Sequence, residues 1–230
     1  MSLNRRSFVS HTVAALGALS LAEATTSEAQ LIDTHTDWDS ARLDKLLRHT
    51  GRARQVFDIK ALADTRTFLG IKNALNGFHF GYSIPLPEIK IVAALHGPPN
   101  LLNFDDSMWA KYRLGEFAQI IDPATSKPAT RNIFYNKTPG RSTDVADRNS
   151  IYQDTSIEAL MERGVQFLSC HTATEEQVHM LSAKLALKAS DDEIVHDLQS
   201  HTLPGVLVVP SMVATISILQ SQGHYTYITA

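Results

Sequence analysis

The chain has 230 residues, a formal net charge of −3 at pH 7 and a single cysteine, Cys170. A mildly acidic chain without a basic cluster has no electrostatic reason to bind nucleic acid, so no such partner is expected. One cysteine also excludes an intramolecular disulfide.

The first thirty residues are typical of a bacterial export signal. Arg5 and Arg6 stand side by side before an uncharged stretch, 11–22, and small residues at cleavage spacing follow, so cleavage is expected after Ala24 or Ala29. The arginine pair resembles the twin-arginine signature. The stretch is shorter than the roughly 18 to 20 apolar residues of a membrane span, and Gly17 argues against the alternative of an amphipathic first helix.

We therefore expect residues 1–29 to be a signal peptide that the twin-arginine translocase recognises during export. The mature protein would be periplasmic or exported, without a membrane anchor. Removing this segment deletes two basic and two acidic residues, so the net charge stays at −3. About 200 residues remain, which makes one domain the default. Residues 30–53 form a polar N-terminal extension with a helix over 39–49, and residues 54–230 form the domain.

Strands alternate with helices through the domain. The apolar run 89–95 suits a strand that is covered on both faces. Thr155 to Glu158 and Thr172 to Glu175 have the spacing of capping boxes, which begin helices. Further strands are predicted at 54–60, 165–169, 206–209 and 225–228, and helices at 61–76 (ended by Gly77), from Asn100, from 155 to Gly164, from 172 to 189, and from Ser211 to Gly223. This alternation predicts a three-layer α/β fold, an open and mainly parallel sheet with helices on both faces.

Residues 119–153 are different, because they are polar, contain three prolines and show little periodicity. The segment is longer than loops usually are in a compact domain. It is expected to be a lid, an oligomer contact or a disordered insertion that lies outside the core.

The strand ends indicate where chemistry would occur, because open parallel sheets bind ligands beyond the carboxyl ends of their strands. Strand 89–95 leads into His96, and strand 165–169 leads into Cys170 and His171. We expect His96 and Cys170 to lie at the same edge of the sheet in adjacent loops. A cysteine just before a helix is also placed where thiolate is stabilised over thiol. Cys170, His96 and His171 are therefore the candidate catalytic residues.

Simpler interpretations remain open for each of them. A lone cysteine at a strand end is more often a small buried hydrophobe than a nucleophile. His171 fits an exposed turn residue, and His96 a hydrogen-bonded structural histidine. The other histidines lack the paired spacing of metal ligands, so no metal site is expected. No P-loop, no GxGxxG after a strand and no GxSxG elbow is present, so no cofactor is expected.

Several segments together resemble the DsrE/DsrF-like sulfur-relay family: Ile89–Gly97, Gly164–Cys170, Pro204–Val206, Ser211 and Leu219–Tyr225. The resemblance covers roughly residues 54–230. It implies a DsrE-like, flavodoxin-like subunit that forms small homo-oligomers. It also implies that Cys170 carries sulfur as a persulfide and that His96 is the histidine after the preceding strand. The segment 119–153 is longer than compact members need, and the expected export differs from the cytoplasmic site of the best-understood members.

Two functions are left open. In the first, the protein is a sulfur transferase or carrier: Cys170 accepts a sulfane sulfur from a small thiol or a donor partner, and His96 assists proton transfer. In the second, it is a non-catalytic oligomer that binds a small molecule or a metal, and Cys170 is a ligand or a bystander. For the sulfur transferase or carrier, the absence of a resolving cysteine leaves unexplained how the sulfur would be released in each cycle.

Overall fold

The structure is a computed structural model that describes residues 38–62, 66–149 and 153–229. The predicted signal peptide and residues 30–37 of the extension lie outside these residues. Within the described ranges, no helix is long and apolar enough to cross a membrane.

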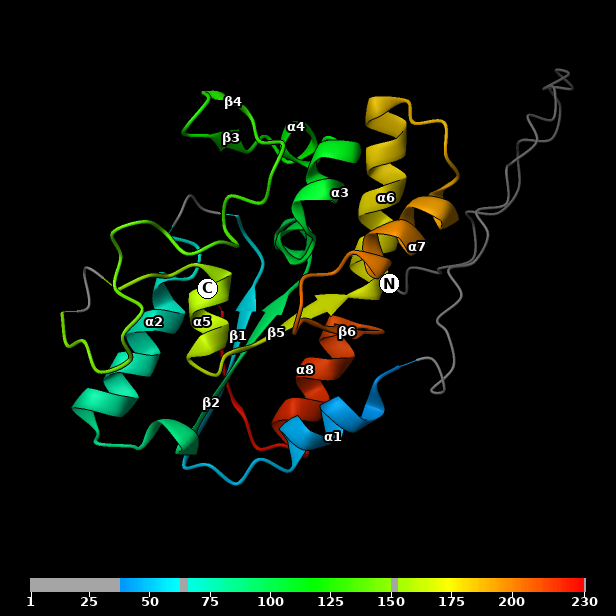
Figure 1. Cartoon of the computed structure of the whole chain (residues 1–230). Helices are drawn as coiled ribbons and strands as arrows, with labels where there is room; N and C mark the ends of the chain where they lie inside the picture. Colours follow the sequence, from blue (N-terminus) through cyan, green and yellow to red (C-terminus); the bar gives the residue numbers. More distant parts are fainter. Residues whose placement is uncertain (1–37, 63–65, 150–152, 230) are drawn as a thin grey trace, which may run out of the picture. The chain divides into compact units, whose positions relative to one another are not determined.

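A five-stranded sheet with the order β6-β5-β2-β1-β7 forms the centre of the domain (Figure 1). All four strand pairings are parallel. The strands are β1 (Ala53–Ile59), β2 (Ile89–Leu95), β5 (Gln166–Cys170), β6 (Leu207–Val209) and β7 (Thr226–Thr229). The predicted run 89–95 is the middle strand, and its residues from Ile91 to Leu95 are at most 1% exposed.

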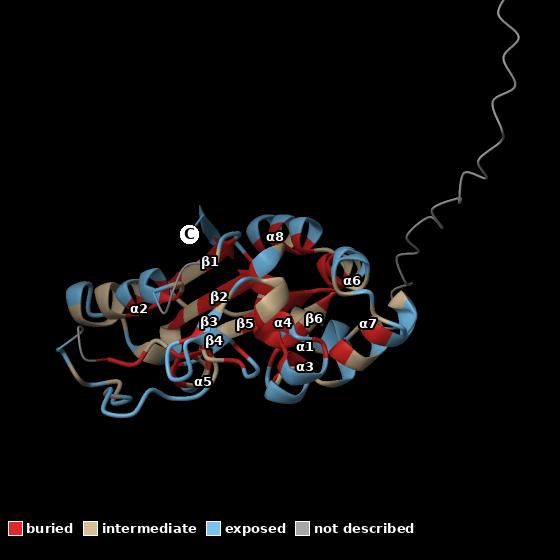
Figure 2. Ribbon diagram, turned by 90° about the horizontal axis from the view of Figure 1, so that it is seen from above, coloured by how far each residue is buried: buried red, intermediate tan, exposed pale blue. Residues whose placement is uncertain are grey.

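Helices cover both faces of the sheet, which confirms the predicted three-layer α/β fold. On the first face, the side chains of Phe57, Ile91 and Phe167 pack against α2 (Leu69–Asn76), α3 (Asp106–Lys111), α5 (Ile157–Glu162), α6 (His171–Leu185) and α7 (Asp191–Ser200). On the second face, Val56, Val92 and Leu168 pack against α1 (Ser40–Leu47) and α8 (Met212–Ser221). Apart from the exposed edge strand β7, the strands are mostly buried, whereas the outer sides of the helices are exposed (Figure 2).

The path of the chain creates a topological switch point between β5 and β6. After β5 the chain enters α6 on the first face, but after the adjacent β6 it enters α8 on the second face. The two connections therefore diverge at the carboxyl ends of neighbouring strands. Ligands bind at such points in open α/β sheets.

Both predicted capping boxes are wrong in detail. The residue that caps α5 is Ser156, whose hydroxyl accepts the N–H of Ala159 at 3.2 Å. Gly164, with φ of +88°, follows this helix as predicted. Helix α6 begins directly at His171 because β5 runs straight into it, and no side chain caps it. It ends at Leu185.

A separate helix, α7, was not predicted, although Ser190 and Glu193 form a capping box at its start. The predicted helix 61–76 begins only at Leu69; it ends at Asn76 with Gly77 as its C-cap, as predicted, and a π-helix, η2 (Gly77–Gly81), follows directly. Instead of one helix from Asn100, the chain forms a 3-10 helix, η4 (Pro98–Asn103), then α3 and α4 (Leu114–Phe117). A second 3-10 helix, η3 (Leu86–Glu88), precedes β2.

The segment 119–153 contributes to the core, contrary to expectation. It contains a small antiparallel pair, β3 (Ile121–Asp122) and β4 (Lys127–Pro128). Phe134 is 6% exposed within the first-face core. The buried amide of Asn132 donates to the carbonyl oxygens of Leu102 and Phe104 at 2.8 and 2.9 Å. These bonds compensate for the low apolar content of the segment, whereas residues 136–149 are exposed or half-buried.

Candidate functional site

Cys170 is the last residue of β5, and it lies at the switch point. Its side chain is on the second face and is 3% exposed. The sulfur accepts the N–H of Met212, the first residue of α8, at 3.3 Å, and it is 3.1 Å from the hydroxyl of Thr172. The sulfur therefore lies at the N-terminal end of α8, the end of a helix that carries partial positive charge.

A buried polar network holds the backbone of Cys170. Asn100, which is fully buried, accepts the N–H of Cys170 at 2.8 Å and the hydroxyl of Ser169 at 3.0 Å. Its amide donates to the hydroxyl of Thr174 at 2.9 Å, and Thr174 donates to the carbonyl oxygen of Cys170 at 3.0 Å. The end of β5 is therefore fixed to η4 and to the first turn of α6.

His96 follows β2 at the position next to Cys170. Leu95 pairs with Ser169, so the next residues along the two strands, His96 and Cys170, are at the same level of adjacent strands. This confirms the prediction that they share one edge of the sheet, although Cys170 is the last residue of β5 and does not lie in a loop. The Nε2 atom of His96 is 2.6 Å from Oδ1 of Asp58 on β1. Nδ1 is then the ring nitrogen that can exchange a proton with a reactant.

Asp58 is a site residue that the sequence analysis missed. Its side chain is 3% exposed, and besides His96 it accepts Lys60 Nζ at 2.8 Å and the Tyr227 hydroxyl at 2.5 Å. Burial alone would raise the pKa of Asp58, but the bonds from Lys60 and Tyr227 and the interaction with His96 outweigh it and lower the pKa. The ionised carboxylate then keeps a proton on Nε2 of His96. The sequence signal that could have identified Asp58 is its position as a charged residue near the end of the largely apolar strand β1.

His171 is adjacent to Cys170 in sequence but makes a different set of contacts. It is 6% exposed, so it is not an exposed turn residue. Nδ1 contacts the side-chain amide of Gln199 on α7, and Nε2 is 3.3 Å from the carboxylate of Glu175. The ring also meets the edge of Trp38, with ring centroids 5.3 Å apart. Both ring nitrogens are thus engaged away from the Cys170 sulfur.

Metal ligands do not gather in the described part of the chain. No group of three or more His, Cys, Asp or Glu residues there could hold a metal ion.

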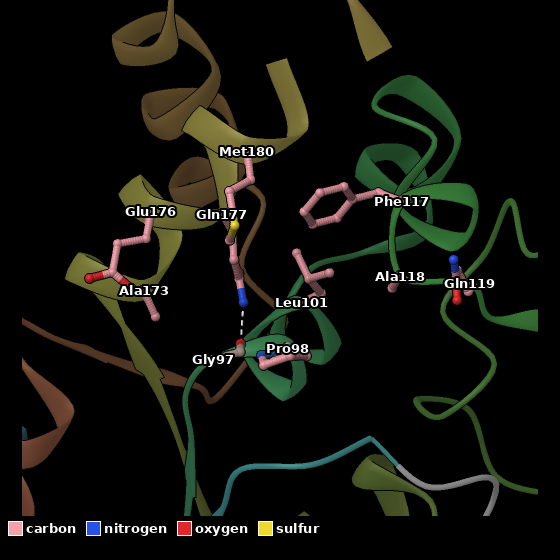
Figure 3. Close-up of a pocket in the computed structure, with 10 residues that line it drawn as sticks. All are labelled: Gly97, Pro98, Leu101, Phe117, Ala118, Gln119, Ala173, Glu176, Gln177 and Met180. Carbon is pink, nitrogen blue, oxygen red and sulfur yellow. Dashed lines mark hydrogen bonds between the residues drawn. The ribbon is translucent and has the colours of Figure 1, made fainter. Parts of the chain in front are cut away.

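A cavity of about 270 Å³ lies between η4, α4 and α6 (Figure 3). Phe117 faces Met180 and Gln177 across it, and the amide of Gln177 donates to the carbonyl oxygen of Gly97. Gly97 directly follows His96, and the lining residue Ala173 packs in the same buried cluster as Cys170. The cavity therefore reaches the residues after β2 and the first turn of α6. The contribution of α4 could not be expected from the strand ends alone.

The site thus contains a buried thiol at a switch point, a histidine–carboxylate pair on the neighbouring strands, and a largely apolar cavity beside them. Comparison of the chain with protein-family models, with curated proteins and with solved structures gave no match in any of the three.

Proposed function

We propose that the protein is an exported, DsrE-like carrier or transferase of sulfane sulfur, with Cys170 as the sulfur-bearing group. The observation that carries this proposal is the position of the sulfur. It accepts the first N–H of α8 at the switch point, one strand away from the His96–Asp58 pair. The resemblance of residues 54–230 to the sulfur-relay family supports the same function.

The transfer that we propose starts from a small persulfide, R–S–SH. The thiol of Cys170 gives its proton to Nδ1 of His96, and the thiolate attacks the outer sulfur of the donor. A new S–S bond forms on Cys170 while the S–S bond of the donor breaks, and its electron pair stays on R–S⁻. This thiolate takes the proton back from His96. The products are R–SH and the Cys170 persulfide, with no net oxidation or reduction.

Asp58 positions His96 in this scheme. Its ionised carboxylate holds the ring through Nε2 and stabilises the imidazolium that forms during the transfer, as the carboxylate of a catalytic triad does. His171 has no part in the proton transfer, because both of its ring nitrogens are engaged elsewhere. The burial of Cys170 limits access to a slim donor, and it slows oxidation of a bare thiol in an oxidising compartment.

Intact-mass measurement tests the proposal. The mature protein incubated with a small persulfide should gain the mass of one sulfur atom, and Cys170→Ser should gain none. His96→Asn should load at least about tenfold more slowly, because general acid–base groups contribute factors of this size or more. His179→Asn is the matched control, since that side chain is 82% exposed. The proposal would be contradicted if the wild-type protein gained no sulfur after incubation with the persulfide. It would also be contradicted if Cys170→Ser gained as much sulfur as the wild-type protein.

A second function, non-catalytic binding of a small molecule, is favoured by the cavity in Figure 3 and by the burial of Cys170. In this case Cys170 is a bystander that reacts with iodoacetamide only after denaturation. An apolar fluorescent probe should then bind the native protein and be excluded by Met180→Trp, which fills the cavity. Val213→Trp is the control, because Val213 is 69% exposed and does not line the cavity. Analytical ultracentrifugation of the mature protein would show whether it forms the homo-oligomer that the family resemblance implies.

A further inference from the structure

The carboxylate of Asp58 divides its two oxygens between different partners. Oδ1 is 2.6 Å from Nε2 of His96. Oδ2 is 2.8 Å from Nζ of Lys60 and accepts the hydroxyl of Tyr227 at 2.5 Å. A carboxylate is a rigid plane, so donors that hold Oδ2 also determine the direction in which Oδ1 points. The orientation of Oδ1 toward His96 therefore depends on the two donors at the other oxygen.

Tyr227 reaches Asp58 from the edge strand. The register of β7 against β1 pairs Tyr227 with Val56 and Thr229 with Asp58, so the phenol extends toward the carboxyl end of β1 to meet the carboxylate. The phenolic oxygen accepts the hydroxyl of Thr229 at 2.9 Å. A phenol has a single O–H to donate, and Thr229 occupies an acceptor position of its oxygen. The proton of Tyr227 is thus directed at Asp58.

Lys60 contributes charge but a weaker geometric constraint. Its side chain is 54% exposed, and Nζ also lies 3.5 Å from the hydroxyl of Tyr227. The pKa of Lys60 is raised, first by its hydrogen bond to Asp58 and then by the charge of that carboxylate. An ammonium group on a flexible stem can follow a carboxylate that rotates, whereas a phenol on a strand is held in place. Of the two donors at Oδ2, Tyr227 is therefore the one that defines an orientation.

We propose that Tyr227 is a positioning residue: by fixing the carboxylate of Asp58, it keeps the proton of neutral His96 on Nε2 and leaves Nδ1 able to accept a proton. A neutral imidazole carries one ring proton, so a ring that holds it on Nδ1 cannot take the proton of the Cys170 thiol. The inference rests on the function proposed for Cys170 in its effect on sulfur transfer. The state of the His96 ring, however, can be measured without a sulfur donor.

Tyr227→Phe tests this role, because it removes only the hydroxyl. The ring nitrogens are measured by ¹⁵N NMR in mature protein labelled at histidine, at a pH above the ordinary titration range of imidazole. The signals of His96 are assigned by their loss in His96→Asn. Wild-type protein should show a protonated Nε2 and an unprotonated Nδ1, whereas Tyr227→Phe should show the averaged shifts of a tautomer mixture. Sulfur loading from a small persulfide should be about fivefold slower in Tyr227→Phe, the factor that one typical hydrogen bond contributes.

Two further variants separate positioning from a general loss of structure. Tyr82→Phe removes the same hydroxyl from a side chain that is 75% exposed. Ile228→Ala shortens the next side chain of β7, which points to the opposite face of the sheet, and it keeps the phenol. Both variants should retain the ring signals of His96 and the loading rate of the wild-type protein. Circular dichroism and thermal unfolding check that each variant is folded.

Wild-type ring signals of His96 in folded Tyr227→Phe would overturn the inference. So would a change of the same size in Ile228→Ala, because any disturbance of β7 would then be sufficient. Equal loading rates in the wild-type protein and in Tyr227→Phe would overturn it as well. A wild-type protein that gains no sulfur would instead contradict the function proposed for Cys170, and the ring signals would still decide the role of Tyr227.

Discussion

Replacement of Asp58 by asparagine should destabilise the protein far more than the same change at a surface carboxylate. The side chain of Asp58 is 3% exposed and accepts three donors, from His96, Lys60 and Tyr227, at 2.5 to 2.8 Å. Asparagine keeps one acceptor oxygen but directs an NH₂ group at partners that are themselves donors. At least one bond to a charged group is lost, and such a bond contributes about 1.5–3 kcal/mol. The NH₂ group of asparagine would also face the donors around it, which adds a further cost. We therefore expect a loss of about 2–4 kcal/mol in the free energy of unfolding.

The pH dependence provides a second check. The pKa of Asp58 is lowered in the folded protein from its ordinary value of 3.8. The unfolded chain therefore binds this proton more readily, and the stability that Asp58 contributes is complete above 3.8 and is lost as the pH falls through the lower folded value. The difference between wild-type and Asp58→Asn should stay constant from neutral pH to about this point and narrow below it.

Urea unfolding at a series of pH values measures both quantities. Asp44→Asn is the control, because the ion pair of Asp44 with Arg48 is exposed and such pairs contribute about 0–1 kcal/mol. Equal unfolding free energies for Asp58→Asn and Asp44→Asn at neutral pH would refute the reasoning. A difference that disappears well above pH 3.8 would instead assign the effect to another group.

Three further predictions concern the rest of the chain. Changing Arg5 and Arg6 to lysine should leave the precursor in the cytoplasm, and full export in a fractionation assay would indicate an ordinary secretory signal. Ile91→Asp should unfold the domain, because Ile91 is 1% exposed in the middle strand. The control Val213→Asp, at a 69% exposed position, should retain a native circular dichroism spectrum. A folded Ile91→Asp variant would contradict this account of the sheet. Limited proteolysis should cut first within 136–149 and leave a folded body, and global unfolding after one cut there would show that this stretch is structural.

The sheet was predictable because its strands are encoded locally. The run 89–95 is apolar at nearly every position, as a strand buried on both faces must be, and Gly164 supplies a left-handed residue at a helix end. Helix α7 was harder to predict, because it buries little besides Ile194 and Leu198 and follows a polar stretch. Gly77 ends α2 as predicted, but its backbone stays right-handed, with φ of −59°, so the chain continues into η2.

The site was predictable only as far as strand order allows. His96 and Cys170 follow neighbouring strands, so their shared edge follows from the parallel sheet. Asp58 becomes part of the site because the register of β1 against β2 places it near His96 and because it accepts the hydroxyl of Tyr227. The direction of His171 depends on α7, which the sequence pattern did not indicate. Contacts set by distant elements cannot be obtained from local periodicity.

The bond between Tyr227 and Asp58 also has a kinetic consequence, because it joins residues 169 positions apart in the chain. The entropy lost on closing a loop of this length is only slightly larger than for a loop of half the length. Contacts between residues far apart in the sequence nevertheless form slowly during folding. Strands β1, β2, β5 and β6 can pair with one another before β7 is added, whereas the edge of β1 stays open until then. Until β7 is added, Asp58 lacks its phenolic donor. The carboxylate that orients His96 would be among the last groups of the site to reach its final surroundings.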